Sequence, residues 1–331
     1  MELMKKRASG VRFPGGSEGR KMKRLYFLDP SLHANLWGGN KLRGYGKVSA
    51  EDRIGESWEL SFVKGAEAKA DGIPVSEAFP KELWGKRAEG FEFFPVLTKF
   101  IDAREKLSVQ VHPDDEYALK NEGMYGKSEM WYVVEADEGA GLYMGTSRNV
   151  TAEEFAEAVK GGTVEDLLSF KKVKAGDVFF IPAGTIHAIG EGVLIFEIQQ
   201  NSTLTYRLYD YMRRDKDGNL RELHVDKAMK VLKAEVYEPV KPAGEGDLHP
   251  EALIGECEYF KTHEYKLSEG AVSLTVNADS FLAITTVSGD ALIECSEGAA
   301  KLALGKSVFI PAGEPFPISI SGTGTVITVE V

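Results

Sequence analysis

The chain has 331 residues, of which 43% are hydrophobic and 27% charged, so it is long enough to bury the apolar cores of two domains. Its formal net charge of −11 at pH 7 argues against nucleic acid or an anionic membrane surface as its main partner. No apolar run reaches the roughly 18 residues that a membrane-spanning helix needs.

The first 24 residues differ from the rest of the chain. They carry eight Lys or Arg against two acidic residues and have little apolar content, so they cannot bury a core. They lack the apolar stretch of a targeting peptide, and Met22 offers an alternative start. We therefore interpret residues 1–22 as a basic disordered tail or a misassigned start. The two cysteines, Cys257 and Cys295, lie far apart without metal-binding spacing, which is typical of reduced packing residues in a cytoplasmic protein.

Short strands are predicted at the beginning of the folded part. Residues 26–29 form a brief apolar run, and the alternation in residues 54–63 predicts a strand in which Trp58 packs in the core. Residues 93–101 have the composition of a buried strand, with Lys99 as its one charged member. A lysine in such a strand either protects a sheet edge or faces inward as a cation, and the sequence leaves both interpretations open.

A polar face is predicted on the next strand, residues 107–113. With a period of two residues, Ser108, Gln110 and His112 lie on one face and the apolar residues lie on the other. A short helix is predicted to follow at residues 116–122, because acidic residues precede it and favour a helix start.

The strand predicted at residues 127–134 adds charged groups to this region. Alternation places Lys127, Glu129 and Trp131 on one face, so a cation and a carboxylate lie two residues apart. Residues of about 151–170 are then predicted to form a small helical insertion, which begins with a capping box and interrupts an otherwise β-rich region. We expect these helices to cover the mouth or the edge of a barrel.

The segment KAGDVFFIPAGTIHAIG, residues 174–190, contains the spacing G-x5-P-x-G-x2-H. An apolar strand is followed by a turn at Pro182 and Gly184, and His187 comes directly after that turn. We predict a hairpin within a small barrel, in which the first residues of the returning strand point into the interior. An imidazole at that position is well suited to bind a metal.

The same spacing recurs near the C-terminus. The IPAG of residues 310–313 aligns with the IPAG of residues 181–184, and Phe316 then takes the place of His187. We interpret the recurrence as an internal repeat of two barrels. One copy holds a metal, and the other has filled its interior with an apolar ring.

A linker is predicted at residues 244–247, where glycines and neighbouring prolines interrupt the pattern. It separates a first domain, residues 23–243, from a second domain, residues 244–331, which consists of short strands. The predicted fold class is therefore mainly β, with two small barrels and a helical insertion in the first. The second domain has no metal ligands.

Four residues are predicted to form one metal site: Gln110, His112, Glu129 and His187. Two imidazoles, a carboxylate and an amide oxygen suit zinc or another divalent ion of similar character. Each of these residues alone would be an ordinary hydrogen-bonding residue. Three separate signals coincide, however: the Q-x-H spacing, the acid on a nearby strand and the motif that ends in histidine. Their coincidence favours a metal site.

The sequence resembles the cupin-type (type I) mannose-6-phosphate isomerases. The resemblance rests on SVQVHPDDEYA, GKSEMWYV, GDVFFIPAGTIHAIG and EIQQNSTLTYRLYDY, together with the earlier WGG and IGESWELS. It extends from about Tyr26 to the C-terminus and is densest in residues 94–213. It implies two cupin (jelly-roll) β-barrels with a helical insertion, a catalytic first domain and one zinc ion per chain in the first barrel. The ligands that it implies are Gln110, His112, Glu129 and His187.

The resemblance also implies an activity, the interconversion of mannose 6-phosphate and fructose 6-phosphate. Moving a carbonyl between C1 and C2 requires a proton to leave one carbon and return to the other through a cis-enediol. Lys127 and Arg207 correspond to active-site cations of the family, and Lys99 is a candidate contact for the phosphate of the substrate. The proton-carrying base stays open between a water molecule at the metal, Lys127 and a carboxylate.

Two other functions are compatible with the sequence. A metal-dependent cupin oxygenase uses a similar His/Glu/His site, although Gln110 counts against a simple triad with open positions. A non-catalytic sugar-phosphate-binding cupin would keep the barrel without turnover, but it would not need the ligands together with Lys127 and Arg207. We expect a small-molecule sugar phosphate as the partner, no nucleic acid or membrane, and a monomer or homodimer.

Overall fold

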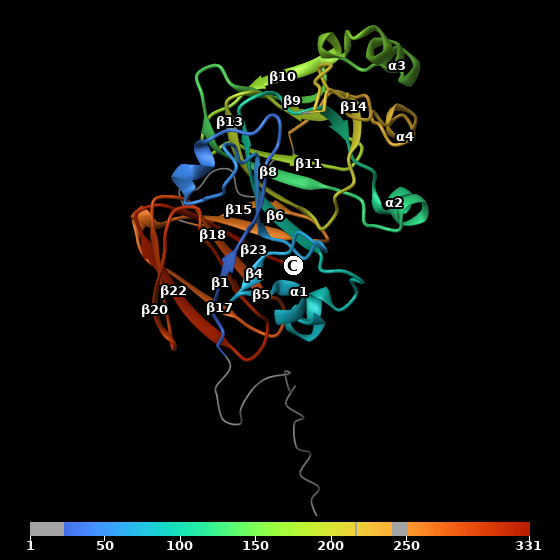
Figure 1. Ribbon diagram of the computed structural model, residues 1–331. Coiled ribbons are helices and arrows are strands. Elements are labelled where there is room, and N and C mark those ends of the chain that lie inside the picture. Colours follow the sequence, from blue (N-terminus) through green and yellow to red (C-terminus); the bar gives the residue numbers. More distant parts are fainter. Residues whose placement is uncertain (1–22, 216, 240–250) are drawn as a thin grey trace, which may run out of the picture.

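The computed structural model describes residues 23–215, 217–239 and 251–331 (Figure 1). Within these ranges the chain is mainly β, which confirms the predicted fold class, and its strands form two sandwiches of two open sheets each rather than closed barrels. No helix in the described ranges is long and apolar enough to cross a membrane. The predictions for residues 1–22 and for the linker at 244–247 lie outside the described residues.

The first sandwich pairs a six-stranded sheet with a five-stranded sheet. The six strands are β2 (Ser31–His33), β3 (Glu56–Leu60), β6 (Val96–Ala103), β8 (Glu129–Ala136), β11 (Val178–Ile181) and β13 (Val193–Gln200). They lie in the order β11-β8-β13-β6-β3-β2. The five strands are β7 (Val109–Val111), β9 (Gly141–Thr146), β10 (Leu168–Lys172), β12 (His187–Ile189) and β14 (Tyr206–Tyr209). Their order is β10-β9-β12-β7-β14.

The second sandwich, mostly orange and red in Figure 1 with three blue strands at one edge, pairs an eight-stranded sheet with a four-stranded sheet. The eight strands are β1 (Tyr26–Asp29), β4 (Lys69–Ala70), β5 (Ile73–Pro74), β15 (Glu251–Glu256), β16 (Lys261–Lys266), β18 (Leu282–Ser288), β21 (Ser307–Ile310) and β23 (Thr325–Glu330). The four strands are β17 (Val272–Val276), β19 (Ala291–Cys295), β20 (Gly298–Leu302) and β22 (Phe316–Gly322). Because β1 pairs with β21, this sandwich takes strands from both sides of the expected boundary between residues 243 and 244.

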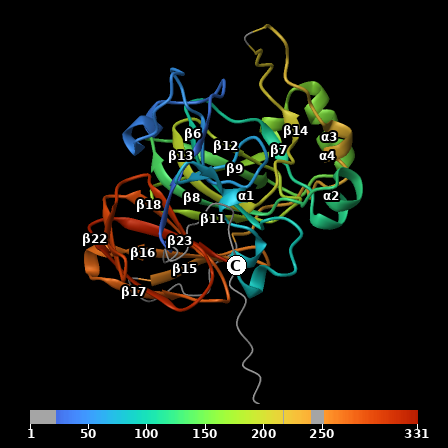
Figure 2. The ribbon, with the colours of Figure 1, turned by 60° about the horizontal axis from the view of Figure 1, so that its bottom comes forward.

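The helices are short. They are α1 (Val75–Ala78), α2 (Asp115–Glu122), α3 (Ala152–Gly161) and α4 (Val225–Ala228), with 3-10 turns η1 (Lys41–Tyr45), η2 (Lys81–Leu83), η3 (Lys86–Ala88), η4 (Val164–Leu167) and η5 (Leu267–Glu269). Figures 1 and 2 show α2, α3 and α4 along one side of the first sandwich. The predicted insertion consists of α3 and η4, and the Thr151 side chain caps α3 by accepting from the Glu154 amide. Residues 168–170, predicted as helical, instead begin β10 and pair with β9.

The predicted hairpin at residues 174–190 is wrong. Strand β11 pairs with β8, whereas β12 pairs with β7 and β9 in the facing sheet. A connection of five residues, 182–186, is long enough to cross the ~10 Å between two packed sheets. The turn therefore changes sheets instead of joining neighbouring strands. The side chain that follows it, His187, is nevertheless fully buried, as expected for the first residue of the strand after the turn.

The repeated motif builds the same crossing in the second sandwich. Strand β21 belongs to its eight-stranded sheet and β22 to its four-stranded sheet, and Phe316 is the first residue of β22. Phe316 is buried in an apolar cluster with Ile293, Ile310 and Ile320. Phe316 thus occupies the position that His187 has in the first sandwich.

The two sandwiches meet through an extensive apolar core. It joins Phe100 and Phe196, from the six-stranded sheet of the first sandwich, with Phe281 and Phe309 from the second sandwich. The two cysteines are free, and each packs against an apolar cluster. The interface therefore resembles the interior of one domain rather than a loose contact between two.

Candidate metal centre and active site

Two histidines and a glutamate meet between the sheets of the first sandwich. His112, Glu129 and His187 each offer a ligand atom, and these atoms lie within 4.8 Å of one another. His187 Nε2 is 3.2 Å from Glu129 Oε1, and His112 Nε2 is 3.8 Å from Glu129 Oε2. Glu129 begins β8 and His187 begins β12, so the facing sheets bring the groups together. All three side chains are buried.

Hydrogen bonds orient both imidazoles toward the glutamate. His112 Nδ1 lies 2.7 Å from the Leu204 carbonyl oxygen, and His187 Nδ1 lies 2.9 Å from that of Thr185. Because a carbonyl only accepts, each Nδ1 carries the proton and each Nε2 presents its lone pair to the space beside Glu129. The buried Glu129 carboxylate has the Lys127 ammonium beside Oε2, while Oε1 faces His187 Nε2 and has no hydrogen-bond donor. A divalent cation would satisfy all of these groups at once.

Burial also sets the protonation of these groups. It lowers the pKa of His187 to about 4 and that of His112 well below its usual value, and the nearby Lys127 charge lowers both further. Burial and the charge of Glu197 raise the pKa of Glu129 to about 7. Neutral imidazoles are the form that binds a metal, so the histidines need not lose a proton at neutral pH.

Gln110 lies beside this cluster. It faces His187 in the pairing of β7 with β12, and its Nε2 is 3.3 Å from His187 Nε2. A half-turn of the amide exchanges its nitrogen and oxygen, which directs the oxygen to the same place. The role of Gln110 as a fourth ligand stays a prediction.

Buried charges of alternating sign extend from the cluster. Lys127 Nζ lies 2.5 Å from Glu129 Oε2 and 3.2 Å from Glu197 Oε1. Lys99 Nζ lies 3.2 Å from the same oxygen of Glu197 and 3.5 Å from Glu56 Oε2. Lys99 is therefore an inward-facing cation, and it does not protect an edge, because β6 lies between β13 and β3.

Glu197 joins the two lysines. Burial alone would raise its pKa, but the charges of Lys127 and Lys99 outweigh burial and lower the pKa to about 2. Trp131 Nε1 donates to its second oxygen at 2.8 Å. The sequence analysis did not single out Glu197. The available signal was an acid within the apolar strand of residues 193–200, directly opposite Lys99 in the β13–β6 register.

Glu56 and Trp58 lie at the other end of this row of charged side chains. Trp58 Nε1 donates to Glu56 Oε2 at 2.7 Å, and Lys99 Nζ lies 5.5 Å from the centre of the Trp58 ring. Trp58 is only half buried, so the prediction that it is simple core is wrong. The tryptophan instead shields an ion pair, as aromatic rings commonly do with cations.

Arg207 lies at the mouth of the site. Its Nε donates to Ser108 Oγ at 3.3 Å, and its Nη1 donates to the Glu222 carbonyl at 2.9 Å. A cavity of about 130 Å³ connects this mouth with the charged interior. Its lining includes Ser108, Gln110, Lys99, Lys127, Glu197, Arg207 and Arg221. The predicted polar face of residues 107–113 thus contributes to the cavity wall.

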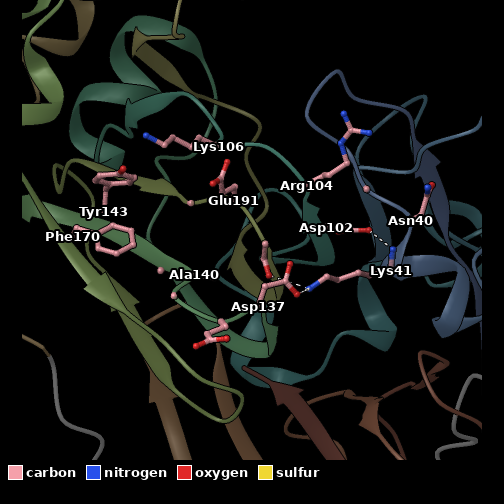
Figure 3. Close-up of a pocket in the computed structure, with 16 residues that line it drawn as sticks. Asn40, Lys41, Asp102, Arg104, Lys106, Asp137, Ala140, Tyr143, Phe170 and Glu191 are labelled. Atoms are coloured by element: carbon pink, nitrogen blue, oxygen red, sulfur yellow. Dashed lines mark hydrogen bonds and ion pairs between the residues drawn. The ribbon is translucent and has the colours of Figure 1, made fainter.

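A larger cavity of about 440 Å³ lies elsewhere in the first sandwich (Figure 3). Lys41 reaches across it to Asp137 at 2.7 Å, and its backbone amide donates to Asp102 at 2.6 Å. None of the predicted site residues lines this cavity. Cavity size therefore does not locate the chemistry of this chain.

The fold and the centre together define a class: a cupin of two jelly-roll sandwiches with a candidate metal site in the first. Residues 25–140 match the family "Phosphomannose isomerase type I, catalytic domain", and residues 252–331 match "Mannose-6-phosphate isomerase, cupin domain". The chain is 36% identical over 296 residues to the mannose-6-phosphate isomerase ManA of Bacillus subtilis, an alignment that covers 87% of this chain and 93% of the relative. The chain belongs to the type I phosphomannose isomerase family.

Other similar proteins agree with this assignment. The mannose-6-phosphate isomerase of Streptococcus mutans is 43% identical over 216 residues, which is 62% of this chain and 67% of the relative. The crystal structure of the Bacillus subtilis mannose 6-phosphate isomerase matches with a TM-score of 0.84 at 30% identity, over 93% of this chain and 100% of that one. The apo form from Salmonella typhimurium, at 20% identity and a TM-score of 0.73 over 93% of this chain and 99% of that one, shows the shared fold alone.

Proposed function

We propose that the protein is a metal-dependent aldose–ketose isomerase that interconverts mannose 6-phosphate and fructose 6-phosphate. The observation that carries the proposal is the buried Glu129 carboxylate, which faces two imidazole lone pairs beside the Lys127 ammonium. The names of the Bacillus and Streptococcus relatives support mannose 6-phosphate as the substrate. A cytoplasmic location and a monomeric or dimeric state belong to the same proposal.

The proposed cofactor is zinc, one ion per chain, held by Gln110, His112, Glu129 and His187. Nitrogen and oxygen ligands of this kind suit zinc. When bound, the ion would polarise the sugar carbonyl and stabilise negative charge on the sugar oxygens. With the ion bound, a single carboxylate among the ligands would leave the site with a net positive charge, which would favour negative charge on the sugar oxygens.

Lys127 is the side chain that we assign to the reacting end of the sugar. Its Nζ lies 3.4 Å from His112 Nε2 and within contact of both Glu129 and Glu197. From this position its ammonium can stabilise an enediolate oxygen and exchange a proton with it. Glu197, with its pKa near 2, is a weak base, so its proposed role is to hold Lys127 and Lys99 in place.

The phosphate of the substrate is proposed to bind toward the mouth. Arg207 presents a guanidinium beside the Ser108 hydroxyl, and this combination matches the oxygens of a phosphate. Lys99, the contact expected from the resemblance, is already paired with Glu197 and Glu56. Its charge is thus largely compensated, so we assign the main phosphate contact to Arg207 and a supporting one to Lys99.

The test is the isomerisation of mannose 6-phosphate by the purified protein, with fructose 6-phosphate identified as the product. The assay is run before chelation, after chelation, after return of zinc, and with His187→Ala. We expect activity that is lost with the chelator, returns with zinc and is absent from the variant. No turnover by the zinc-loaded wild type would overturn the proposal. Oxygen uptake with iron would then favour a cupin oxygenase, and binding without turnover would favour a sugar-phosphate-binding cupin.

A further inference from the structure

A fully buried ion pair joins the two sandwiches outside the cavity. Lys47 Nζ lies 2.6 Å from Glu59 Oε1, and both side chains are at most 1% exposed. Each partner also bonds to the second sandwich: Lys47 donates to the Gly305 carbonyl at 2.5 Å, and the Ser307 hydroxyl donates to Glu59 Oε2 at 3.0 Å. The pair is thus fixed by groups from both sandwiches.

Stability alone does not account for this ion pair. Removing two charges from water costs free energy that their attraction often fails to return, and apolar residues of similar size are commonly as stable. Burial lowers the pKa of Lys47, in keeping with that cost, while the charge of Glu59 opposes the change. An ion pair does, however, fix relative position more sharply than apolar packing, because its donors and acceptors have preferred directions.

The strand that carries Glu59 also carries part of the active site. Side chains of β3 alternate, so Glu56 and Trp58 reach Lys99 on one face of the strand. Ser57 and Glu59 lie on the other face, and Ser57 donates to Glu59 at 2.6 Å. Any shift of β3 along or across the sheet therefore moves both sets of side chains together.

Backbone pairing leaves this part of β3 weakly fixed. The register between β3 and β6 is irregular between Trp58 and Leu60, which is where Glu59 lies. An irregularity of this kind interrupts the ladder of hydrogen bonds and permits local bending. The side-chain bonds of Glu59 supply the constraint that the ladder lacks at this point.

The second copy of the repeated motif forms the surface through which the second sandwich contacts the first. Gly305 is the first glycine of the second copy, and a Cβ at this position would meet the Tyr45 carbonyl oxygen at 2.4 Å. The equivalent residue of the first copy, Gly176, has no atom within 4 Å of such a Cβ. The same turn is therefore free in the metal-binding copy and packed against the first sandwich in the other copy.

We propose that Lys47 and Glu59 form a positioning latch, through which the second sandwich fixes β3 and so sets Glu56 and Trp58 against Lys99. The second sandwich thereby acts on the active site without lining it. Glu59 and Lys47 are positioning residues, since they act through Glu56. The kinetic part of the test rests on the proposed isomerase function.

The test compares full-length zinc-loaded proteins. Ser307→Ala removes the bond from the second sandwich to Glu59, and the double variant Lys47→Met, Glu59→Leu replaces the latch by apolar groups and so avoids an unpaired buried charge. Tyr132→Phe is the matched control, because Tyr132 donates to Glu264 across the same interface at 2.9 Å and its side chain lies on the opposite face of β8 from Glu129 and Trp131. We expect both latch variants to lower kcat/KM roughly 5- to 50-fold at unchanged zinc content, since small displacements near reacting groups are costly. The control should keep wild-type kcat/KM at a similar loss in Tm.

Coupling between the latch variants and Glu56→Gln distinguishes a positioning role of the latch from a general loss of structure. If the latch acts through Glu56, adding Glu56→Gln to a latch variant should lower kcat/KM much less than Glu56→Gln does in the wild type. Amide hydrogen exchange of residues 56–60 should also increase in the latch variants and not in Tyr132→Phe. Additive effects on kcat/KM, wild-type kcat/KM in the latch variants, or unchanged exchange would each overturn the latch. A wild type without isomerase activity would overturn the proposed function instead, and the exchange measurement would still decide the latch.

Discussion

The two sandwiches share a topology and a repeated motif, yet their interiors have opposite chemistry. In the first, the crossing from β11 to β12 delivers His187 into a group of buried charges that includes Glu129 and Lys127. In the second, the equivalent crossing delivers Phe316 into an apolar cluster. The jelly roll thus fixes where the first residue after the turn points, and the identity of that residue decides whether the interior binds a ligand or packs.

This division has an energetic side. Burying an aromatic side chain stabilises a fold by about 1.5–3 kcal/mol, whereas each charge taken from water must be compensated by a partner. The first sandwich compensates with alternating lysines and carboxylates, and it packs against the apolar core that it shares with the second. The apolar packing of the second sandwich therefore offsets part of the free energy that the buried charges of the first sandwich cost.

Exchanging the two equivalent residues tests the comparison most severely. His187→Phe gives the first sandwich the residue of the second, and we expect kcat/KM to fall by at least about 10³-fold because the metal and its electrostatic effect are lost together. The isomerase assay with added zinc measures this. Activity within tenfold of wild type would contradict the assignment of His187.

The next effect is expected at the mouth of the first sandwich. Arg207→Ala removes a guanidinium that we assign to the phosphate, and charge-assisted hydrogen bonds of this strength predict a loss in kcat/KM of about 10- to 100-fold. The loss should appear mainly in KM. Arg207→Lys should recover part of it, because the charge returns without the fork of donors. Wild-type kcat/KM in Arg207→Ala would remove Arg207 from the site.

Glu197→Gln sharpens the account of the paired charges. Since the two lysines hold the pKa of Glu197 at about 2, this carboxylate stays ionised across the working range of pH. The variant should therefore lower kcat/KM about tenfold, through poorly held lysines, without moving the acid limb of the pH profile. Glu264→Gln, a buried acid of the second sandwich, is the control and should leave kcat/KM unchanged. An acid limb that shifts in Glu197→Gln would show that Glu197 itself titrates during turnover.

The reverse exchange should have the smallest effect on catalysis. Phe316→His places a polar ring in an apolar cluster beneath the Arg24 guanidinium, which lies 5.0 Å from the ring centre. We expect the free energy of unfolding to decrease by about 1–3 kcal/mol because the imidazole is buried without a partner. Urea unfolding measures the change, and kcat/KM should stay at the wild-type value. A large loss of activity would mean that the second sandwich takes part in the chemistry directly.

The sequence predicted most about the site where its signals were local. The Q-x-H spacing, the strand alternation around Glu129 and the motif before His187 are all readable within a few residues, and the structure brings the side chains of His112, Glu129 and His187 together. Gln110 lies beside them.

Features that depend on distant strands were missed or left open. A turn of the same local composition can join neighbouring strands in a hairpin or strands of facing sheets in a jelly roll. Residues 182–186 alone therefore did not predict in which sheet the strand after β11 lies. The orientation of Lys99 depended on its partners Glu197 and Glu56, which come from other strands. Both acids lie within segments that carry the family resemblance, IGESWELS and EIQQNSTLTYRLYDY, but their pairing with Lys99 follows only from the pairing of β6 with β13 and β3.

The central claim is that one of two equivalent positions is a metal site and the other is packing. Its most direct test is the number of zinc ions bound per chain, measured by mass spectrometry after chelation, reloading and removal of free metal. We predict one ion for the wild type, none for His187→Phe and one for Phe316→His. Two ions in the wild type, or one retained in His187→Phe, would contradict the claim.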